Sequence, residues 1–141
     1  MLLESDVIDA VCLHLESQDY IISQRLRPTQ RGDDIVAVKD GIPNRKLIIE
    51  AKGETSSRKG SSRYGKPFSS AQVRDHVSTA FYKAAEILSR KQADVEIRAG
   101  IALPTTKNHQ RMIENILPIL NQLGILVFWV AENGDVTIRG I

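Results

Sequence analysis

Two acidic residues and a lysine lie at the edges of two neighbouring apolar runs. Asp34 begins the first run, and Glu50 and Lys52 lie at the end of the second. The Asp-Gly turn at residues 40–41 joins the runs as a hairpin and would bring the two carboxylates side by side. Because strand side chains alternate, Glu50 and Lys52 share a face while Ala51 points away into packing. The pattern predicts two carboxylates and one ammonium group at one end of a sheet.

Such a cluster suits the hydrolysis of phosphodiester bonds. Carboxylate oxygens bind Mg²⁺, which stabilises charge on a phosphate and lowers the pKa of a bound water. The lysine could orient that water, assist its deprotonation or neutralise the transition state. Neighbouring acids favour a charged lysine, so charge stabilisation is the role we expect. The alternative is a solvated surface ion pair, which such a spacing often gives by chance.

Composition is that of one globular domain over residues 1–141. The chain is 42% hydrophobic and 26% charged, with a formal net charge of +2, which neither requires nor excludes nucleic acid. Its one cysteine, Cys12, excludes an internal disulfide framework. There is no signal-peptide pattern and no apolar stretch of membrane-spanning length. We therefore expect a cytoplasmic protein with no membrane partner.

Periodicity and turn residues predict helices alternating with strands. The helices are expected at 5–17, 71–91 and 107–123, and the strands at 20–26, 34–39, 45–52, 95–103, 125–130 and 136–139. Candidate residues for the helix ends are Ser5, Ser69 or Ser70, Thr106 and Gly124. This order predicts an α/β protein with a mixed central sheet, arranged as a three-layer α/β/α sandwich.

The two apolar runs also resemble a known signature. Residues 32–37, Gly-Asp-Asp-Ile-Val-Ala, and residues 47–53, Leu-Ile-Ile-Glu-Ala-Lys-Gly, are similar to the PD-(D/E)XK nuclease motif. That superfamily includes type II restriction enzymes, Mrr-like enzymes and archaeal Holliday-junction resolvases. The motif covers only residues 32–53, whereas the resemblance in the order of elements spans most of the chain.

The resemblance implies a restriction-endonuclease-like αβββαβ core and Mg²⁺-dependent hydrolysis of DNA, with Mn²⁺ as a substitute. By position, Asp34, Glu50 and the Ala51 carbonyl would bind metal, and Lys52 would be the catalytic lysine. Asp33 stands where the motif usually has proline, which leaves open which aspartate binds. Relatives often place a further acid on the first helix, for which this chain offers Glu4, Asp6 and Asp9.

Gln72 is a secondary catalytic candidate. Some relatives carry a glutamine near the metal, on the helix that follows the lysine strand. His76 lies one turn further on the same face of this helix. The usual aromatic partner of that glutamine is absent, and a surface glutamine is the alternative.

A basic segment follows the proposed catalytic lysine. Between Glu54 and Asp75 there is no acidic residue, and five basic residues are candidates for binding DNA: Arg58, Lys59, Arg63, Lys66 and Arg74. Tyr64 and Phe68 are interleaved with them. Basic side chains bind phosphates without reading sequence, and aromatic rings stack on bases. We expect this segment to contact DNA, and a solvated loop is the alternative.

Other residues are better explained by structure. Residues 60–66 imitate a phosphate-binding loop, but Pro67 replaces the hydroxyl residue that binds Mg²⁺, so we expect no nucleotide cofactor. Cys12 and Trp129 are expected in the core. The start of the third predicted helix carries Lys107, His109 and Arg111. These side chains could contact phosphates, or they could be solvated residues of the first helical turns.

These features together predict a metal-dependent DNA endonuclease. One active site per chain favours a homodimer for cleavage of two strands. Two alternatives remain open: a catalytically inactive nucleic-acid-binding module of the same fold, and a protein-interaction domain in which the acids are ordinary surface charges. Restriction, repair, junction resolution and a mobile-element role are not distinguished.

Overall fold

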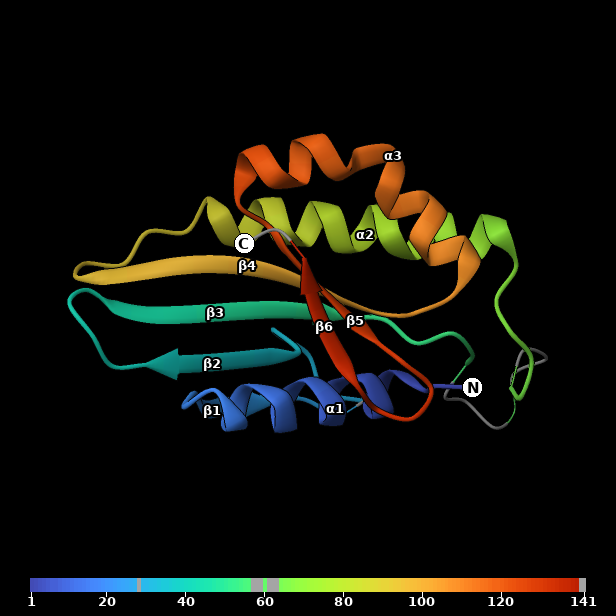
Figure 1. The fold of residues 1–141 in the computed structure, drawn as a ribbon, viewed down its shortest axis with the longest axis horizontal. Helices are drawn as coiled ribbons and strands as arrows, with labels where there is room; N and C mark the ends of the chain where they lie inside the picture. Colours follow the sequence, from blue (N-terminus) through green and yellow to red (C-terminus); the bar gives the residue numbers. More distant parts are fainter. Residues whose placement is uncertain (28, 57–59, 61–63, 140–141) are drawn as a thin grey trace.

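The computed structural model describes residues 1–27, 29–56, 60 and 64–139. The helices are α1 (Glu4–Ser17), α2 (Ser70–Leu88) and α3 (Lys107–Leu123). The strands are β1 (Ile21–Arg25), β2 (Ile35–Lys39), β3 (Asn44–Ala51), β4 (Val95–Pro104), β5 (Leu126–Val130) and β6 (Val136–Arg139). Each of these elements was predicted, with ends that differ by a few residues (Figure 1).

The strands of the described chain form one mixed sheet in the order β1-β2-β3-β4-β5-β6. The β1–β2 and β2–β3 pairs are antiparallel, and the turn at residues 40–41 joins β2 and β3 as a hairpin. The β3–β4 and β4–β5 pairs are parallel, because α2 and α3 carry the chain back across the sheet. The last pair, β5–β6, is antiparallel. The α/β class with a mixed sheet is therefore confirmed.

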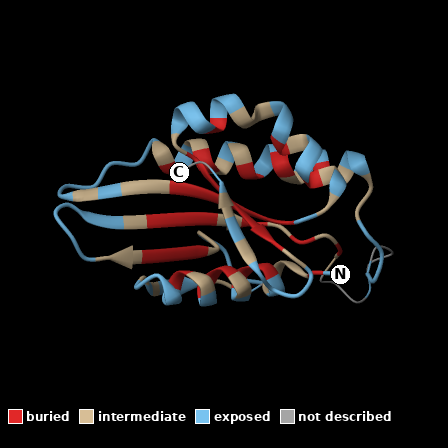
Figure 2. Ribbon diagram, in the orientation of Figure 1, coloured by how far each residue is buried: buried red, intermediate tan, exposed pale blue. Residues whose placement is uncertain are grey.

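Helices cover both faces of the sheet, with α1 on one face and α2 and α3 on the other (Figure 1). The buried residues follow the middle of the sheet between these helices (Figure 2). Along β3, Leu47, Ile49 and Ala51 pack on the α1 side, whereas Ile48 packs on the α2 side. By the same alternation, Glu50 lies on the α2 side of the sheet.

Side-chain caps begin α2 and α3. The Ser69 hydroxyl accepts a hydrogen bond from the Gln72 N–H at 3.3 Å, and the Thr106 hydroxyl accepts one from the His109 N–H at 3.2 Å. Gly124 ends α3 with a φ of +69°, in the left-handed region that suits glycine. The predicted ends of α3 are confirmed, and Ser69 is the cap among the two serines considered for α2.

The predicted Ser5 cap of α1 is wrong. The helix begins at Glu4, and Leu3 occupies the N-cap position without a side-chain cap. The Leu3 N–H instead donates to Asp6 Oδ2 at 2.8 Å. The Asp6 carboxylate thus accepts the N–H of the N-cap residue itself, as the third helical residue does in a capping box.

Cys12 and Trp129 are buried, as predicted, in the clusters on opposite faces of the sheet. Over the described ranges, no helix combines the length and the apolar character needed to cross a membrane. The two apolar clusters instead pack the helices against the sheet.

Candidate active site

Asp34 and Glu50 meet at the end of the β2–β3 hairpin. Ile35 pairs with Ile49 in this antiparallel ladder, so Asp34 and Glu50 are the next residues out on their strands. The Ala51 N–H donates to Asp34 Oδ2 at 2.8 Å, which fixes the aspartate at the strand end. The Glu50 carboxyl hydrogen-bonds to that of Asp34. The hairpin therefore brings the two acids together.

Lys52 joins the same cluster. Its Nζ lies 3.3 Å from Glu50 Oε2, and the two side chains are only 19% and 13% exposed. The Lys52 N–H donates to the Ala102 carbonyl at 3.0 Å, which continues the pairing of β3 with β4 and fixes the backbone there. This ion pair is therefore partly withdrawn from water, unlike an ordinary surface pair.

Electrostatics at the cluster disfavour two fully charged carboxylates. Burial, reinforced by the charge of Asp34, raises the pKa of Glu50 to about 7, and Lys52 only partly opposes this effect. Burial also raises the pKa of Asp34, although the hydrogen bond from Ala51 works in the other direction. The positive charge of Lys52 therefore does not fully offset the effect of burial and of the neighbouring carboxyl group on the pKa of Glu50.

Glu4 is the acid of the first helix that reaches this cluster. Burial raises the pKa of Glu4, and its carboxyl hydrogen-bonds with that of Asp34. Asp6 is used at the start of α1, and Asp9 pairs with Arg25 on β1 at 3.1 Å. The structure thus selects Glu4 from the three acids that the sequence left open.

Gly53 allows the start of α1 to approach the end of β3. A Cβ at this position would lie 2.5 Å from the Glu4 nitrogen and 2.8 Å from the Leu3 carbonyl carbon. The adjacent segments are joined by hydrogen bonds from the Glu54 N–H to the Leu2 carbonyl at 2.9 Å and from the Leu2 N–H to Glu54 Oε1 at 2.7 Å. Glycine is therefore required here by close backbone packing, and this packing positions Glu4.

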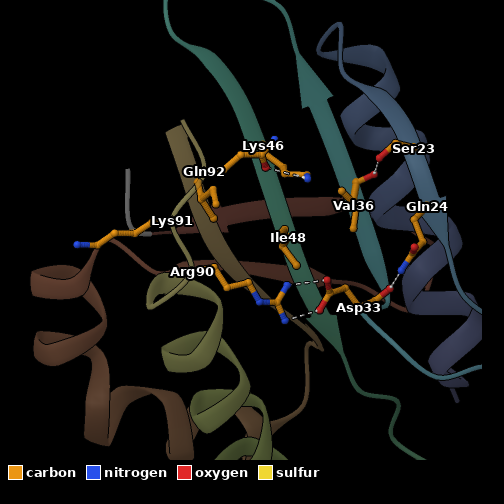
Figure 3. Close-up of a pocket in the computed structure, with 10 residues that line it drawn as sticks. Ser23, Gln24, Asp33, Val36, Lys46, Ile48, Arg90, Lys91 and Gln92 are labelled. Atoms are coloured by element: carbon orange, nitrogen blue, oxygen red, sulfur yellow. Dashed lines mark hydrogen bonds and ion pairs between the residues drawn. The ribbon is translucent and has the colours of Figure 1, made fainter. Parts of the chain in front are cut away.

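Asp33 faces a different part of the sheet, which settles which aspartate meets Glu50. Its two carboxylate oxygens accept hydrogen bonds from Arg90 at 2.8 and 3.0 Å (Figure 3). Lys83 Nζ lies 3.4 Å from Asp33 Oδ1. The Arg90 guanidinium holds the pKa of Asp33 below its usual value. A hollow of about 450 Å³ is lined by Asp33 and Arg90 but not by Asp34, so it is separate from the carboxyl cluster.

A smaller pocket of about 200 Å³ opens beside Lys52, and we call it the Lys52 pocket. It is lined by Glu4, Lys52, Gly53, Thr55, Ser56, Phe68 and His76. The Phe68 N–H donates to the Glu54 carbonyl at 2.9 Å, which closes the base of the connection between β3 and α2. Phe68 was considered for stacking on bases, but its ring is half-buried and packs edge-on against His76.

The other predicted residues are not gathered at the carboxyl cluster. Gln72 uses its Oε1 to accept the Ser69 N–H at 2.9 Å in the cap of α2, and a catalytic role for it stays a prediction. Lys66 and Arg74 are exposed, and their contact with DNA stays a prediction. Arg58, Lys59 and Arg63 lie outside the described residues.

His109 contradicts the expectation of a solvated helix start. It is only 1% exposed, and its Nδ1 lies 2.6 Å from the Thr106 hydroxyl. Burial lowers the pKa of His109 to about 4, so the ring is neutral at pH 7. The signal in the sequence was its position one turn before Ile113 on the apolar face of α3.

The donor set of the carboxyl cluster fits a magnesium ion. No group of three or more His, Cys, Asp or Glu side chains in the described part of the chain is arranged to hold a metal. Mg²⁺ requires fewer side chains, because it binds through one or two carboxylates and keeps several waters. Asp34 and Glu50 supply the carboxylates. The Ala51 carbonyl lies on the same side of β3 as the N–H that reaches Asp34.

Comparison with known proteins gave no match: no family model, no curated protein and no solved structure is significantly similar to this chain.

Proposed function

We propose that this protein is a metal-dependent DNA endonuclease with a restriction-endonuclease-like fold. The observation that carries the proposal is the crowding of two carboxyl groups, Asp34 and Glu50, together with the contact of Glu50 with Lys52 at 3.3 Å. A purely structural cluster would gain little from holding two acids together with raised pKa values. Perturbed pKa values of this kind are frequent at catalytic sites.

Each residue of the cluster has a role in this proposal. Asp34, Glu50 and the Ala51 carbonyl hold Mg²⁺ or Mn²⁺, with Glu4 beside them. A bound ion of this kind supplies stabilisation of phosphate charge and an acidified water. The Lys52 ammonium binds a non-bridging oxygen of the scissile phosphate and stabilises the charge that develops there.

The element order supports the proposed fold. One helix, a three-stranded meander, a crossover helix and a parallel strand follow one another as αβββαβ. The cluster lies where β2 begins and β3 ends, so it is at the ends of these strands rather than in the middle of the sheet. The connection that carries the predicted basic residues starts at this same end of β3, which supports DNA as the partner.

The proposal is tested by incubating linear, supercoiled, single-stranded and branched DNA with the protein in Mg²⁺ or Mn²⁺ and, separately, in EDTA. Lys52→Ala is compared with Lys46→Ala, a matched control. Lys46 is also partly buried and lies on the same face of β3, towards the other end of the strand. We expect cleavage with metal by the parent and by Lys46→Ala, and none by Lys52→Ala.

Three other results would change the proposal. Metal-independent binding of DNA without cleavage of any substrate would favour an inactive nucleic-acid-binding module. Failure to bind DNA at all would favour a protein-interaction domain. Cleavage by Lys52→Ala at the parent rate would remove Lys52 from the mechanism. Gel filtration of the same preparation tests the proposed homodimer.

A further inference from the structure

Strand β6 forms one edge of the sheet. In the described chain it pairs with β5 on one side, and the order of strands ends there. The Ala131 N–H donates to the Asp135 carbonyl at 2.9 Å, which makes these two residues a hydrogen-bonded pair of the antiparallel ladder. Because such pairs alternate with non-hydrogen-bonded ones, the backbone groups of Val136 and Ile138 point away from β5. Their N–H and C=O groups therefore face the outer edge, where another strand could bind.

The sequence of this edge strand is complementary to itself. Asp135 and Arg139 lie two residues to either side of Thr137, and the apolar Val136 and Ile138 lie next to it. In an antiparallel pair of two β6 strands with the two-fold axis at Thr137, each Asp135 faces the partner's Arg139. The same register places Val136 opposite the partner's Ile138. Cross-strand pairs of opposite charge and of apolar side chains both stabilise a sheet.

The backbone and the charges require the same register. With the axis at Thr137, the outward groups of Val136 and those of the partner's Ile138 exchange both of their hydrogen bonds. Asp135 and the partner's Arg139 then form a non-hydrogen-bonded pair, in which side chains lie closest. An axis at Val136 or at Ile138 would also use the outward groups, but it would bring no opposite charges of the described residues together. The axis at Thr137 therefore satisfies both requirements.

The side chains of β6 are available for this pairing. Arg139 is exposed and takes part in no ion pair among the described residues. Asp135 is also exposed, and its carboxylate accepts the Asn133 side-chain N–H at 3.1 Å. On the other face, Val136 and Ile138 are half-buried at the margin of the apolar cluster under α1. A second copy would cover them and continue this cluster across the interface.

The opposite edge strand, β1, is not suited to such pairing. Its register with β2 shifts between Ile22 and Gln24, whereas the register of β6 with β5 is regular. Irregularities of this kind keep an edge strand from pairing with another chain. The charged side chain of β1, Arg25, is already held at 3.1 Å from Asp9 Oδ1 and 3.6 Å from Glu16 Oε1. Of the two edges, β6 is therefore the one that fits a second copy.

We propose that β6 is the interface of a homodimer, in which the sheets of two copies join edge to edge about a two-fold axis at Thr137. This interface depends on β6 alone and does not require that the protein cleaves DNA. Three strand spacings separate β3 from β6 in each copy, and one more crosses the interface. The two β3 strands, whose ends carry the carboxyl clusters, are then roughly 34 Å apart. The pairing thus joins the two copies at a distance from both clusters.

Reversal of the charges tests the register. Analytical ultracentrifugation of the full chain, in EDTA and without DNA, should show a dimer for the parent. Arg139→Asp and Asp135→Arg should each raise the dissociation constant of the dimer roughly 30-fold or more, because each variant places like charges opposite each other at two positions. An equimolar mixture of the two variants should dimerise again, because every facing pair then joins opposite charges. This recovery also shows that both variants are folded.

Thr137→Lys tests the position of the axis, because two ammonium groups would meet there and should weaken the dimer by a similar factor. Ile21→Lys, at an exposed position of β1, is the matched control and should stay dimeric. A monomeric parent, or a dimer whose dissociation constant is unchanged in all three β6 variants, would overturn the proposal. A parent dimer that responds to these variants but cleaves no DNA in Mg²⁺ would remove the proposed function and leave the interface. A monomer that cleaves DNA would do the reverse.

Discussion

Replacement of Glu50 by glutamine should make the protein more stable at alkaline pH. Glu50 has its pKa raised from 4.5 to about 7, mainly by burial and then by Asp34. The folded state therefore holds this proton more tightly than the unfolded chain does. Folding loses stability as the pH rises from the unfolded pKa through the folded one, and does not change with pH outside that window.

The size of the effect follows from the shift. Each pKa unit corresponds to about 1.4 kcal/mol, so the whole shift of Glu50 corresponds to about 3 kcal/mol. No discount for solvent screening applies, because the Glu50 side chain is only 13% exposed. The free energy of unfolding of Glu50→Gln, relative to the parent, should rise by this amount between about pH 4 and about pH 8.

Urea unfolding followed by circular dichroism measures this difference at each pH, in EDTA. Glu114→Gln, an exposed position on α3, is the control and should differ from the parent by a small, constant amount. Magnesium adds a second comparison at alkaline pH. At about ten times its Kd it should stabilise the parent by about 1.4 kcal/mol and stabilise Glu50→Gln much less. A difference between Glu50→Gln and parent that does not change with pH would refute the crowding of carboxyl groups.

Three further predictions test the surroundings of the site. Asp33→Asn should cost about 1 kcal/mol or less, because its partner Arg90 is 40% exposed, and should leave cleavage intact. This cost in stability is present above the ordinary pKa of Asp33, 3.8, and disappears as the pH falls through the lowered pKa of Asp33 in the folded protein. Loss of cleavage in Asp33→Asn would instead give Asp33 the role proposed for Asp34. Gly53→Ala should destabilise the protein by roughly 1–3 kcal/mol and slow cleavage by displacing Glu4. Gly60→Ala is the control, because a Cβ at this position would meet no atom within 4 Å. Equal stability and equal cleavage rates of the two variants would contradict the close packing of Gly53 against the start of α1. Joint replacement of Arg58, Lys59 and Arg63 by alanine should reduce the slope of log K for DNA binding against log salt concentration by up to about 3. Fluorescence anisotropy measures this slope, and an unchanged slope would show that these residues do not contact phosphates.

Local signals in the sequence were sufficient for the elements and for the first part of the site. The apolar periodicity of each segment and the turn at residues 40–41 depend on neighbours along the chain. The contact between Asp34 and Glu50 depends on one hairpin, so strand alternation was enough to predict it. The same alternation placed Glu50 and Lys52 together, and their side chains do form an ion pair.

Features that depend on packing between distant segments were not predictable in this way. Glu4 reaches the cluster only because residues 2 and 54 pair and Gly53 has no side chain. Asp33 is removed from the cluster by Arg90, which lies 57 residues later in the chain. His109 was recoverable in part, because it shares the apolar face of α3 with Ile113, but its polar neighbours masked that pattern.

The central claim is that the carboxyl cluster where β2 begins and β3 ends hydrolyses DNA. The most direct measurement is the initial rate of cleavage of supercoiled plasmid by the parent protein and by Asp34→Asn, in Mg²⁺ and in EDTA. We predict cleavage by the parent in Mg²⁺ but not in EDTA, and a rate at least roughly 100-fold lower for Asp34→Asn. Cleavage that persists in EDTA, or that Asp34→Asn retains in full, would contradict the central claim.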